Sequence, residues 1–229
     1  MNAWLEKLNE TFIATEYWKM IPEGLLNTVI ITMGALVIGV VIGTIVAVTK
    51  FLCEGSRVLK PFVALCDLYV TVIRGIPVVV QLLIFYFVIF ASSDNGVFVA
   101  TITFGINSGA YMAEIIRSGL NAVDPGQMEA GRSLGMSRLQ TMKTIILPQA
   151  VRYILPAIGN EFIALLKETS VAGYVAVMDL TRAGNLIRNK TFDAINPFLI
   201  VAVTYLVIVV ILSKLMKLLE RRLAKSDKR

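Results

Sequence analysis

The stretch LLNTVIITMGALVIGVVIGTIVAVT, residues 25–49, contains no charged side chain. As an α-helix it would be about 37 Å long, since each residue adds about 1.5 Å. That length is sufficient to cross the hydrocarbon core of a bilayer, which is about 30 Å thick, with some tilt. Residues 25–49 therefore predict a transmembrane helix, and this prediction decides the class of fold.

The composition of the whole chain agrees with a membrane protein. Of its 229 residues, 56% are hydrophobic and only 17% are charged, whereas a soluble domain carries about 25% charged residues. The chain has no histidine, which removes the commonest metal ligand and the commonest general acid–base group. Cys53 and Cys66 form no metal-binding pattern. We expect neither a metal site nor an enzymatic active site on this chain.

Four further apolar stretches follow, at about residues 62–91, 97–120, 144–166 and 194–213. With residues 25–49 they predict an all-α integral membrane protein with five transmembrane helices. The predicted organisation has three parts. These are an N-terminal interfacial segment at residues 1–24, a transmembrane domain at 25–216 with a cytoplasmic loop at 121–143, and a basic cytoplasmic tail at 217–229.

The N-terminal residues 1–21 mix charged and aromatic side chains, without the basic start and apolar core of a signal peptide. This pattern predicts an amphipathic helix that lies on the membrane surface. Trp4, Tyr17 and Trp18 would then sit at the level of the lipid headgroups.

The distribution of Lys and Arg predicts the orientation. The connections after the first, third and fifth predicted spans, with the adjoining span ends, hold 15 of the 22 basic residues. Arg74 lies inside a span, and the other six basic residues lie in the N-terminal segment and the remaining connections. Positively charged loops stay in the cytoplasm, so we expect the N-terminus outside and the C-terminus inside. The net charge of +6 then reflects the membrane, and nucleic acid is not an expected partner.

The predicted cytoplasmic loop contains DPGQMEAGRSLGMSR, residues 124–138. Asp124 followed by Pro125 is typical of a helix start, with an N-cap and then Pro in the first turn. Gly131 and Gly135 are four residues apart, so on a helix they would share one face and leave it bare for another backbone. Alternatively, Gly135 ends the helix. An ordinary amphipathic interfacial helix is the simpler interpretation of this segment.

The spacing within residues 129–148 resembles the EAA loop of bacterial ABC importer permeases. The segment EAG at 129–131 is followed at fixed intervals by Gly135, Ile145 and the pair Leu147-Pro148; Gly131 replaces the usual third Ala. In that family the loop forms a coupling helix that docks in a cleft of the ATPase subunit. The resemblance implies an ATPase contact at Gly126, Glu129, Ala130, Gly131, Gly135, Leu147 and Pro148.

Further segments resemble the polar amino acid subfamily of these permeases, the histidine, glutamine and arginine type. They are TVIRGIPVVVQ at 71–81, GAYMAEIIR at 109–117, ILPQA at 146–150 and LKETS at 166–170. The family's Arg-Gly-Thr-Pro sequence has Ile76 in place of Thr here. That subfamily has five helices per subunit, which agrees with the count of apolar stretches.

The resemblance implies an importer of the bacterial inner membrane that carries a polar amino acid, in our interpretation a basic one, into the cytoplasm. Its partners would be ABC ATPase subunits, a second permease subunit, an extracytoplasmic amino-acid-binding protein and the lipid bilayer. Whether the two permease subunits are identical stays open. The chain has no GxxxxGK[ST] motif, so we expect ATP and Mg on the ATPase and no cofactor on this chain.

Arg74 lies midway along the second predicted span, directly before Gly75 and close to Pro77. A broken membrane helix presents free backbone N–H groups, and Arg adds a fixed positive charge, so this place suits an α-carboxylate. The alternative is an ion pair between Arg74 and Asp67, two helical turns earlier.

Asn160 and Glu161 lie one turn past Pro156 in the fourth predicted span. A carboxylate there is costly unless it is paired, and it would suit the cationic side chain or the α-ammonium of an amino acid. If it recognises the side chain, the substrate is basic. The alternative is a salt bridge from Glu161 to Lys167 or Arg74.

Glu114 and Arg117 lie three residues apart near the predicted cytoplasmic end of the third span. We expect an ion pair that positions the coupling loop or closes an inner gate.

Two rival functions remain open on the residues alone. An ion-gradient-driven secondary amino acid transporter or channel would use intramembrane charges equally well, and a membrane enzyme or scaffold is the second. The transporter or channel does not account for the spacing of residues 129–148. An enzyme would need a reactive set of side chains, and none is found in a chain without histidine. A scaffold would keep the loop but show no transport.

Overall fold

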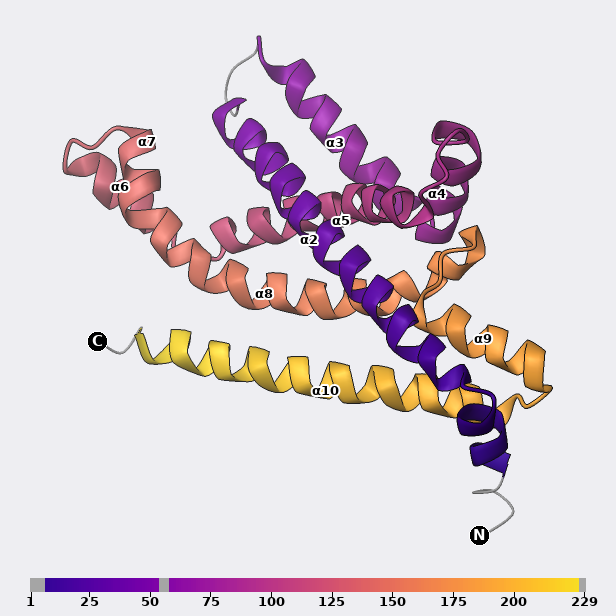
Figure 1. Ribbon diagram of the computed structural model, residues 1–229. Coiled ribbons are helices and arrows are strands. Elements are labelled where there is room, and N and C mark those ends of the chain that lie inside the picture. Colours follow the sequence, from indigo (N-terminus) through magenta and orange to yellow (C-terminus); the bar gives the residue numbers. More distant parts are fainter. Residues whose placement is uncertain (1–6, 54–57, 227–229) are drawn as a thin grey trace. The chain divides into compact units, whose positions relative to one another are not determined.

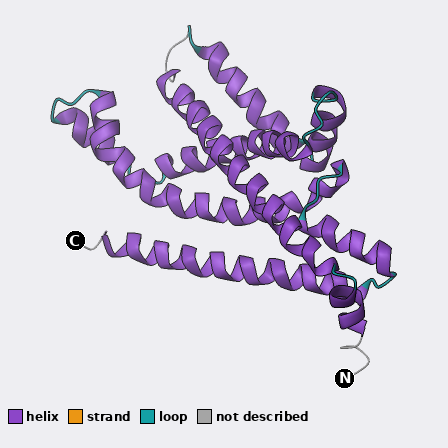
Figure 2. Ribbon diagram, in the orientation of Figure 1, coloured by secondary structure: helices purple, strands orange, loops and turns teal. Residues whose placement is uncertain are grey.

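The computed structural model describes residues 7–53 and 58–226, and these ranges form helices and short connections without a β-strand (Figure 2). Figure 1 labels the longer helices. Their bounds are α2 Met20–Cys53, α3 Lys60–Gly75, α4 Val78–Ile84, α5 Gly96–Asn121, α6 Gly126–Ser133, α7 Arg138–Thr141, α8 Leu147–Glu168, α9 Leu180–Thr191 and α10 Ile195–Ser226. Short 3₁₀ and π turns complete the chain: η1 Asn9–Ala14, η2 Tyr17–Lys19, η3 Phe85–Ile89, η4 Met142–Ile146 and η5 Thr169–Val175.

The chain forms two compact units. Unit 1 comprises the described part of Met1–Val37 with Ile76–Gly105 and Ile163–Leu212. Unit 2 comprises the described part of Ile38–Gly75 with Ile106–Phe162 and the described part of Ser213–Arg229. Each of the four longest helices, α2, α5, α8 and α10, contributes residues to both units.

Unit 1 has an apolar core at the meeting point of several helices. Ile31 of α2, Leu82 of α4 and Phe104 of α5 have no exposed surface, and they cluster with Leu165 of α8 and Ala172 of η5. In a bilayer, close packing of this kind holds helices together, because lipid is as apolar as the side chains.

In unit 2, glycines of α2 allow α5 to approach closely. A Cβ built on Gly39 would lie 2.8 Å from the Ser108 hydroxyl oxygen. One built on Gly43 would lie 2.8 Å from backbone atoms of both Met112 and Ala113. Small residues at helix contacts are typical of membrane proteins, so the glycines of the first predicted span have a packing role.

Within the described residues, three helices are long and apolar enough to cross a membrane: Tyr17–Cys53, Gly96–Asn121 and Ile195–Arg222. The number becomes four if Lys60–Gly75 and Val78–Ile89, which are bent at their break, count as one span. The predicted fourth span corresponds to α8, which has 22 residues but carries Arg152, Glu161 and Lys167 and does not meet the same criterion. The count of five spans therefore stays a prediction.

The described part of the predicted N-terminal amphipathic segment is helical over residues 7–14, which include the π-helix η1, and a 3₁₀ turn, η2, follows. Glu16 between them has a left-handed backbone with φ 58°. Phe12 is buried, and the Thr11 hydroxyl donates to Asp193 Oδ2 at 3.2 Å, whereas Glu10 and Ile13 are exposed. The place of this segment at the membrane surface stays a prediction. Trp18 is half exposed.

Some residues used in the sequence predictions lie outside the described ranges. These are Trp4 of the N-terminal segment, Arg57 of a basic connection, and residues 227–229 of the basic tail.

We expect Gly43→Ala to lower the melting temperature of the purified permease complex in detergent. The added methyl group would overlap the backbone at Met112 and Ala113, and overpacking of this kind costs about 1–3 kcal/mol. Gly75→Ala is the matched control, because a Cβ at Gly75 meets nothing within 4 Å. Equal melting temperatures for the two variants would contradict the close contact between α2 and α5.

Candidate functional site

The second apolar stretch is interrupted at the place where the sequence has Gly and Pro. The helix α3 ends at Gly75, and Pro77 has φ −56° and ψ 135°, outside the helical range. Pro also lacks the N–H needed to continue the helix. The Gln81 side chain donates from Nε2 to the Ile76 carbonyl at 2.8 Å, which satisfies one backbone group released by the break. Arg74 stands directly before this interruption.

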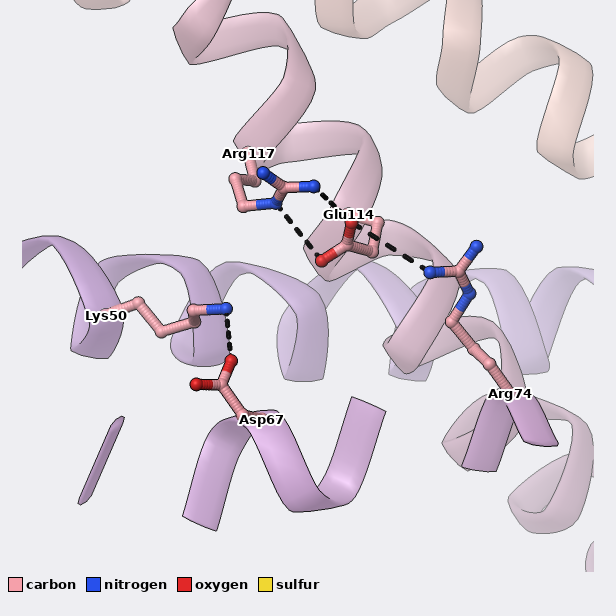
Figure 3. Close-up of polar contacts among 5 residues, drawn as sticks. All are labelled: Lys50, Asp67, Arg74, Glu114 and Arg117. Carbon is pink, nitrogen blue, oxygen red and sulfur yellow. Dashed lines mark hydrogen bonds and ion pairs between the residues drawn. The ribbon is translucent and has the colours of Figure 1, made fainter. Parts of the chain in front are cut away.

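The Arg74 guanidinium faces α5 from the last turn of α3 (Figure 3). Its Cζ lies 5.1 Å from the centre of the Tyr111 ring, a cation–π distance. Its Nη1 lies 3.9 Å from Glu114 Oε2, at the outer limit of an ion pair. The side chain is 43% exposed. The aromatic ring therefore holds the guanidinium while much of it stays accessible.

Glu114 makes a much closer contact with Arg117. Arg117 Nη2 donates to Glu114 Oε2 at 2.6 Å, and Nε donates to Oε1 at 3.2 Å (Figure 3). Two such bonds from one guanidinium form a two-pronged, charge-assisted pair. Glu114 thus meets two arginines, one tightly along its own helix and Arg74 loosely from α3.

The alternative pairing of Arg74 with Asp67 is wrong. Asp67 Oδ1 accepts a hydrogen bond from Lys50 Nζ of α2 at 2.6 Å (Figure 3). Seven residues of helix separate Asp67 from Arg74, a rise of about 10 Å, so the two side chains lie at different levels of α3.

A cavity of about 450 Å³ in unit 2 brings several predicted residues together. Arg74, Glu114 and Glu161 all contribute to its wall. Two tyrosines, Tyr111 and Tyr153, also line it. One cationic group, two carboxylates and two aromatic rings thus border a volume suited to a small charged molecule.

A buried serine positions the Glu161 carboxylate. Ser108 of α5 has no exposed surface, and its hydroxyl donates to Glu161 Oε1 at 3.2 Å. The sequence predictions missed Ser108, Tyr111 and Tyr153. Spacing on the third predicted helix gives a signal for two of them, because Ser108, Tyr111 and Glu114 recur every three residues and share one helix face.

The structure does not bring Asn160 to this cavity. Asn160 is exposed and is absent from the described residues that line the cavity with Glu161. Successive residues of an α-helix point about 100° apart, so neighbours in the sequence face different surroundings. Gly75 and Pro77 likewise shape the break and do not line the cavity wall.

The predicted cytoplasmic loop forms two short helices, α6 and α7. Asp124 Oδ1 accepts from the Gly126 backbone N–H at 2.7 Å. The helix α6 begins at Gly126, one residue later than predicted, with Pro125 at its N-cap. Ser137 and Gln140 form a reciprocal capping box at α7, with bonds of 3.2 Å and 2.8 Å. The loop therefore has fixed ends and a defined shape.

The predicted bare glycine face is wrong. Gly131 is buried, and a Cβ there would collide with the Thr141 side chain of α7. Gly135 follows α6, with φ +83°, and a Cβ there would meet nothing within 4 Å. Gly131 thus closes the packing within the loop, while Gly135 supplies the left-handed turn that ends the helix.

Other side chains of the loop are exposed. Glu129 and Ala130 of α6 face outward, and Leu134 is 81% exposed. Leu147 and Pro148 are exposed in the first turn of α8, directly after the π-helix η4.

The loop is anchored by an apolar cluster of unit 2. Val123, Ile146, Ala150 and Ile154 are buried together, and Met128 of α6 packs against them. The cluster fixes α6 to the beginning of α8.

The chain is similar to known transport proteins over most of its length. Residues 39–225 match the family model described as "Binding-protein-dependent transport system inner membrane component". The chain is 37% identical over 206 residues to a putative glutamine transport system permease protein, GlnP, of Rickettsia prowazekii, covering 89% of this chain and 92% of the relative. It is 36% identical to the arginine transport system permease protein ArtQ of Bacillus subtilis, covering 89% and 94%.

Solved structures agree with these relatives. The crystal structure of an amino acid ABC transporter with histidines has 40% identity, a TM-score of 0.83, and coverage of 91% of this chain and 96% of that one. An inward-facing methionine ABC transporter, MetNI, has 19% identity and a TM-score of 0.76, with coverage of 89% and 96%; it shares the fold.

The family model covers most of the chain, and the relatives are more than a third identical to it over nearly all of its length. This protein belongs to the binding-protein-dependent transport system inner membrane components, the permease subunits of ABC importers.

Proposed function

We propose that this permease subunit carries a polar amino acid with a cationic side chain into the cytoplasm, driven by a separate ATPase. The observation that carries the proposal is the cavity bordered by Arg74, Glu114 and Glu161. Arg74 matches the carboxylate of such a substrate and Glu161 its cationic side chain, while Glu114 contacts Arg74 and Arg117.

Each charged group has a distinct part in the proposed site. Arg74 would bind the α-carboxylate, because its guanidinium is accessible and suits two-pronged carboxylate binding. Glu161, held by Ser108, would receive the cationic side chain. The rings of Tyr111 and Tyr153 favour a cation between them.

The similar proteins support an amino acid as the substrate and leave glutamine and arginine both open. One relative is named for glutamine and another for arginine. The Glu161 carboxylate in the cavity favours the arginine type. If Glu161 binds the α-ammonium group instead, a neutral amino acid such as glutamine becomes the substrate. A secondary transporter or channel is not favoured, since the chain belongs to a family of ABC importers.

Family membership implies ATPase subunits, a binding protein and a second permease subunit as partners. We place the ATPase contact on the exposed part of the loop at Glu129, Ala130 and Leu134, with Gly126, Leu147 and Pro148 beside it. Gly131 and Gly135 would act indirectly, through the shape of the loop. ATP and Mg would bind the ATPase. The extracytoplasmic binding protein would contact the connection that includes η5 and α9.

We place the chain in the bacterial inner membrane with five spans, α8 being the fourth. The N-terminus is outside and the loop and C-terminus are cytoplasmic, as the distribution of basic residues favours. The parts are the N-terminal segment at 1–24, the permease domain at 25–216 and the tail at 217–229.

Glu129→Lys is expected to reduce binding-protein-stimulated ATP hydrolysis at least tenfold in the reconstituted complex. The change reverses an exposed charge on α6 at the proposed ATPase contact, and like charges across an interface oppose association. Co-purification of the ATPase with the permease should fall in parallel. Glu220→Lys makes the same charge change on exposed α10 and should have little effect. Full stimulation in the Glu129 variant would rule out this contact.

Glu161→Gln is expected to weaken uptake of arginine and lysine by tenfold or more, and uptake of glutamine much less. The variant keeps the shape of the side chain and removes the charge that a basic substrate would meet. Transport into proteoliposomes under competition among these amino acids measures the difference. Glu168→Gln changes a carboxyl group on the same helix outside the cavity and is the control. Equal loss for basic and neutral substrates would point to ammonium binding or a structural role.

The orientation is testable with cysteine labelling. In a variant with Cys53 and Cys66 replaced by Ala, Glu220→Cys should react with a membrane-impermeant maleimide only after the cytoplasmic face is opened. Asp94→Cys, at an exposed position in the connection after η3, should react from the outside in intact cells. The reverse pattern would invert the proposed topology.

A further inference from the structure

Glu114 borders two cavities of unit 2. One is the proposed substrate cavity, which it shares with Arg74 and Glu161. The other has a volume of about 770 Å³, and its wall includes Glu114 and Arg117. Asp124 and Pro125, which precede α6, and Met128 of α6 also line this second cavity. A single carboxylate therefore belongs both to the substrate cavity and to a cavity beside the coupling loop.

The two arginine contacts of Glu114 are unequal. The same oxygen, Oε2, lies 2.6 Å from Arg117 and 3.9 Å from Arg74 (Figure 3). Arg117 also contacts Oε1 at 3.2 Å, whereas Arg74 makes a single long contact. The Glu114 side chain is 23% exposed. The bond to Arg117 is thus the stronger one, and the contact with Arg74 is the one that can be lost at little cost.

A substrate carboxylate would bind the Arg74 guanidinium, which Glu114 also contacts. A guanidinium binds a carboxylate best with two parallel N–H···O bonds. Arg74 has free N–H donors for such a pair, and its ring contact with Tyr111 keeps the guanidinium in place. The substrate carboxylate and Glu114, both negative, would repel each other over one arginine. Binding of one therefore disfavours the other.

We propose that Glu114 is an internal competitor of the substrate for Arg74. In the empty site Glu114 bridges Arg74 and Arg117. An arriving substrate carboxylate takes Arg74, and Glu114 then pairs with Arg117 alone, in the wall of the cavity beside the coupling loop. Glu114 is in this role a positioning residue that signals occupancy. The inference rests on the proposed function, in which Arg74 binds the substrate carboxylate.

Binding of radiolabelled L-arginine to the purified permease–ATPase complex, without nucleotide or binding protein, tests the competition by equilibrium dialysis. Glu114→Gln should lower the Kd for arginine about three- to fivefold, since the competing charge is gone, and an exposed ion pair shifts an equilibrium by up to about fivefold. Arg117→Gln should raise the Kd by a similar factor, because Glu114 is then left to Arg74 alone.

Agmatine, which is arginine without its carboxylate, is the matched probe. Its Kd should stay within twofold of the wild-type value in both variants, because it does not compete with Glu114 for Arg74. Changes in the same direction in both variants, or equal changes for agmatine and arginine, would indicate a purely structural role and overturn the inference.

Arg74→Gln separates the two levels of the hypothesis. It should raise the Kd for arginine at least tenfold and change the Kd for agmatine little. If the wild-type complex does not bind arginine, or if Arg74→Gln leaves its Kd unchanged, the proposed substrate site fails and the competition fails with it. If Arg74→Gln raises the Kd for arginine, but Glu114→Gln and Arg117→Gln do not change it in opposite directions, only the competition fails.

Discussion

The pairing of charged side chains inside apolar helices is the constraint on which unit 2 depends. A charge held there without a partner costs several kcal/mol. Glu114 satisfies this requirement with Arg117 on its own helix and with Arg74 across from α3, and Asp67 of α3 is matched by Lys50 of α2. The Lys50–Asp67 pair joins α3 to α2. At the end of α3, the contact with the Tyr111 ring holds the Arg74 guanidinium against α5.

The coupling loop obeys a different constraint, which is steric. Gly131 packs against Thr141 so closely that a side chain cannot fit, and Gly135 adopts a left-handed backbone that other residues enter only with strain. The reciprocal cap at Ser137 and Gln140 holds the second helix. The two glycines suggest an open surface in the sequence, but they belong to an internally packed element on which Glu129 and Leu134 are exposed.

Features that depend on local sequence could be predicted, and features that depend on packing could not. The charge-free first span and the break at Pro77 follow from apolarity and from the chemistry of proline. The Lys50–Asp67 pair joins two helices, so its existence depends on their relative rotation. The separation of Asn160 from Glu161 follows from a helical rotation of about 100° per residue that only a fixed helix orientation resolves. The contact of Thr11 with Asp193 joins residues far apart in the chain, so the sequence around the N-terminal segment could not predict it.

In the proposed function, substrate selection and ATPase coupling are joined by short, continuous steps within unit 2. Arg117 lies one helical turn beyond Glu114, and α5 ends at Asn121, one further turn along. Val123 then enters the buried cluster that holds Met128 of α6 against α8. Close-packed side chains transmit displacement, because their interior tolerates little compression. A shift in the balance of Glu114 between its two arginines would therefore act on the last turns of α5, and through Val123 on the position of the coupling helix itself.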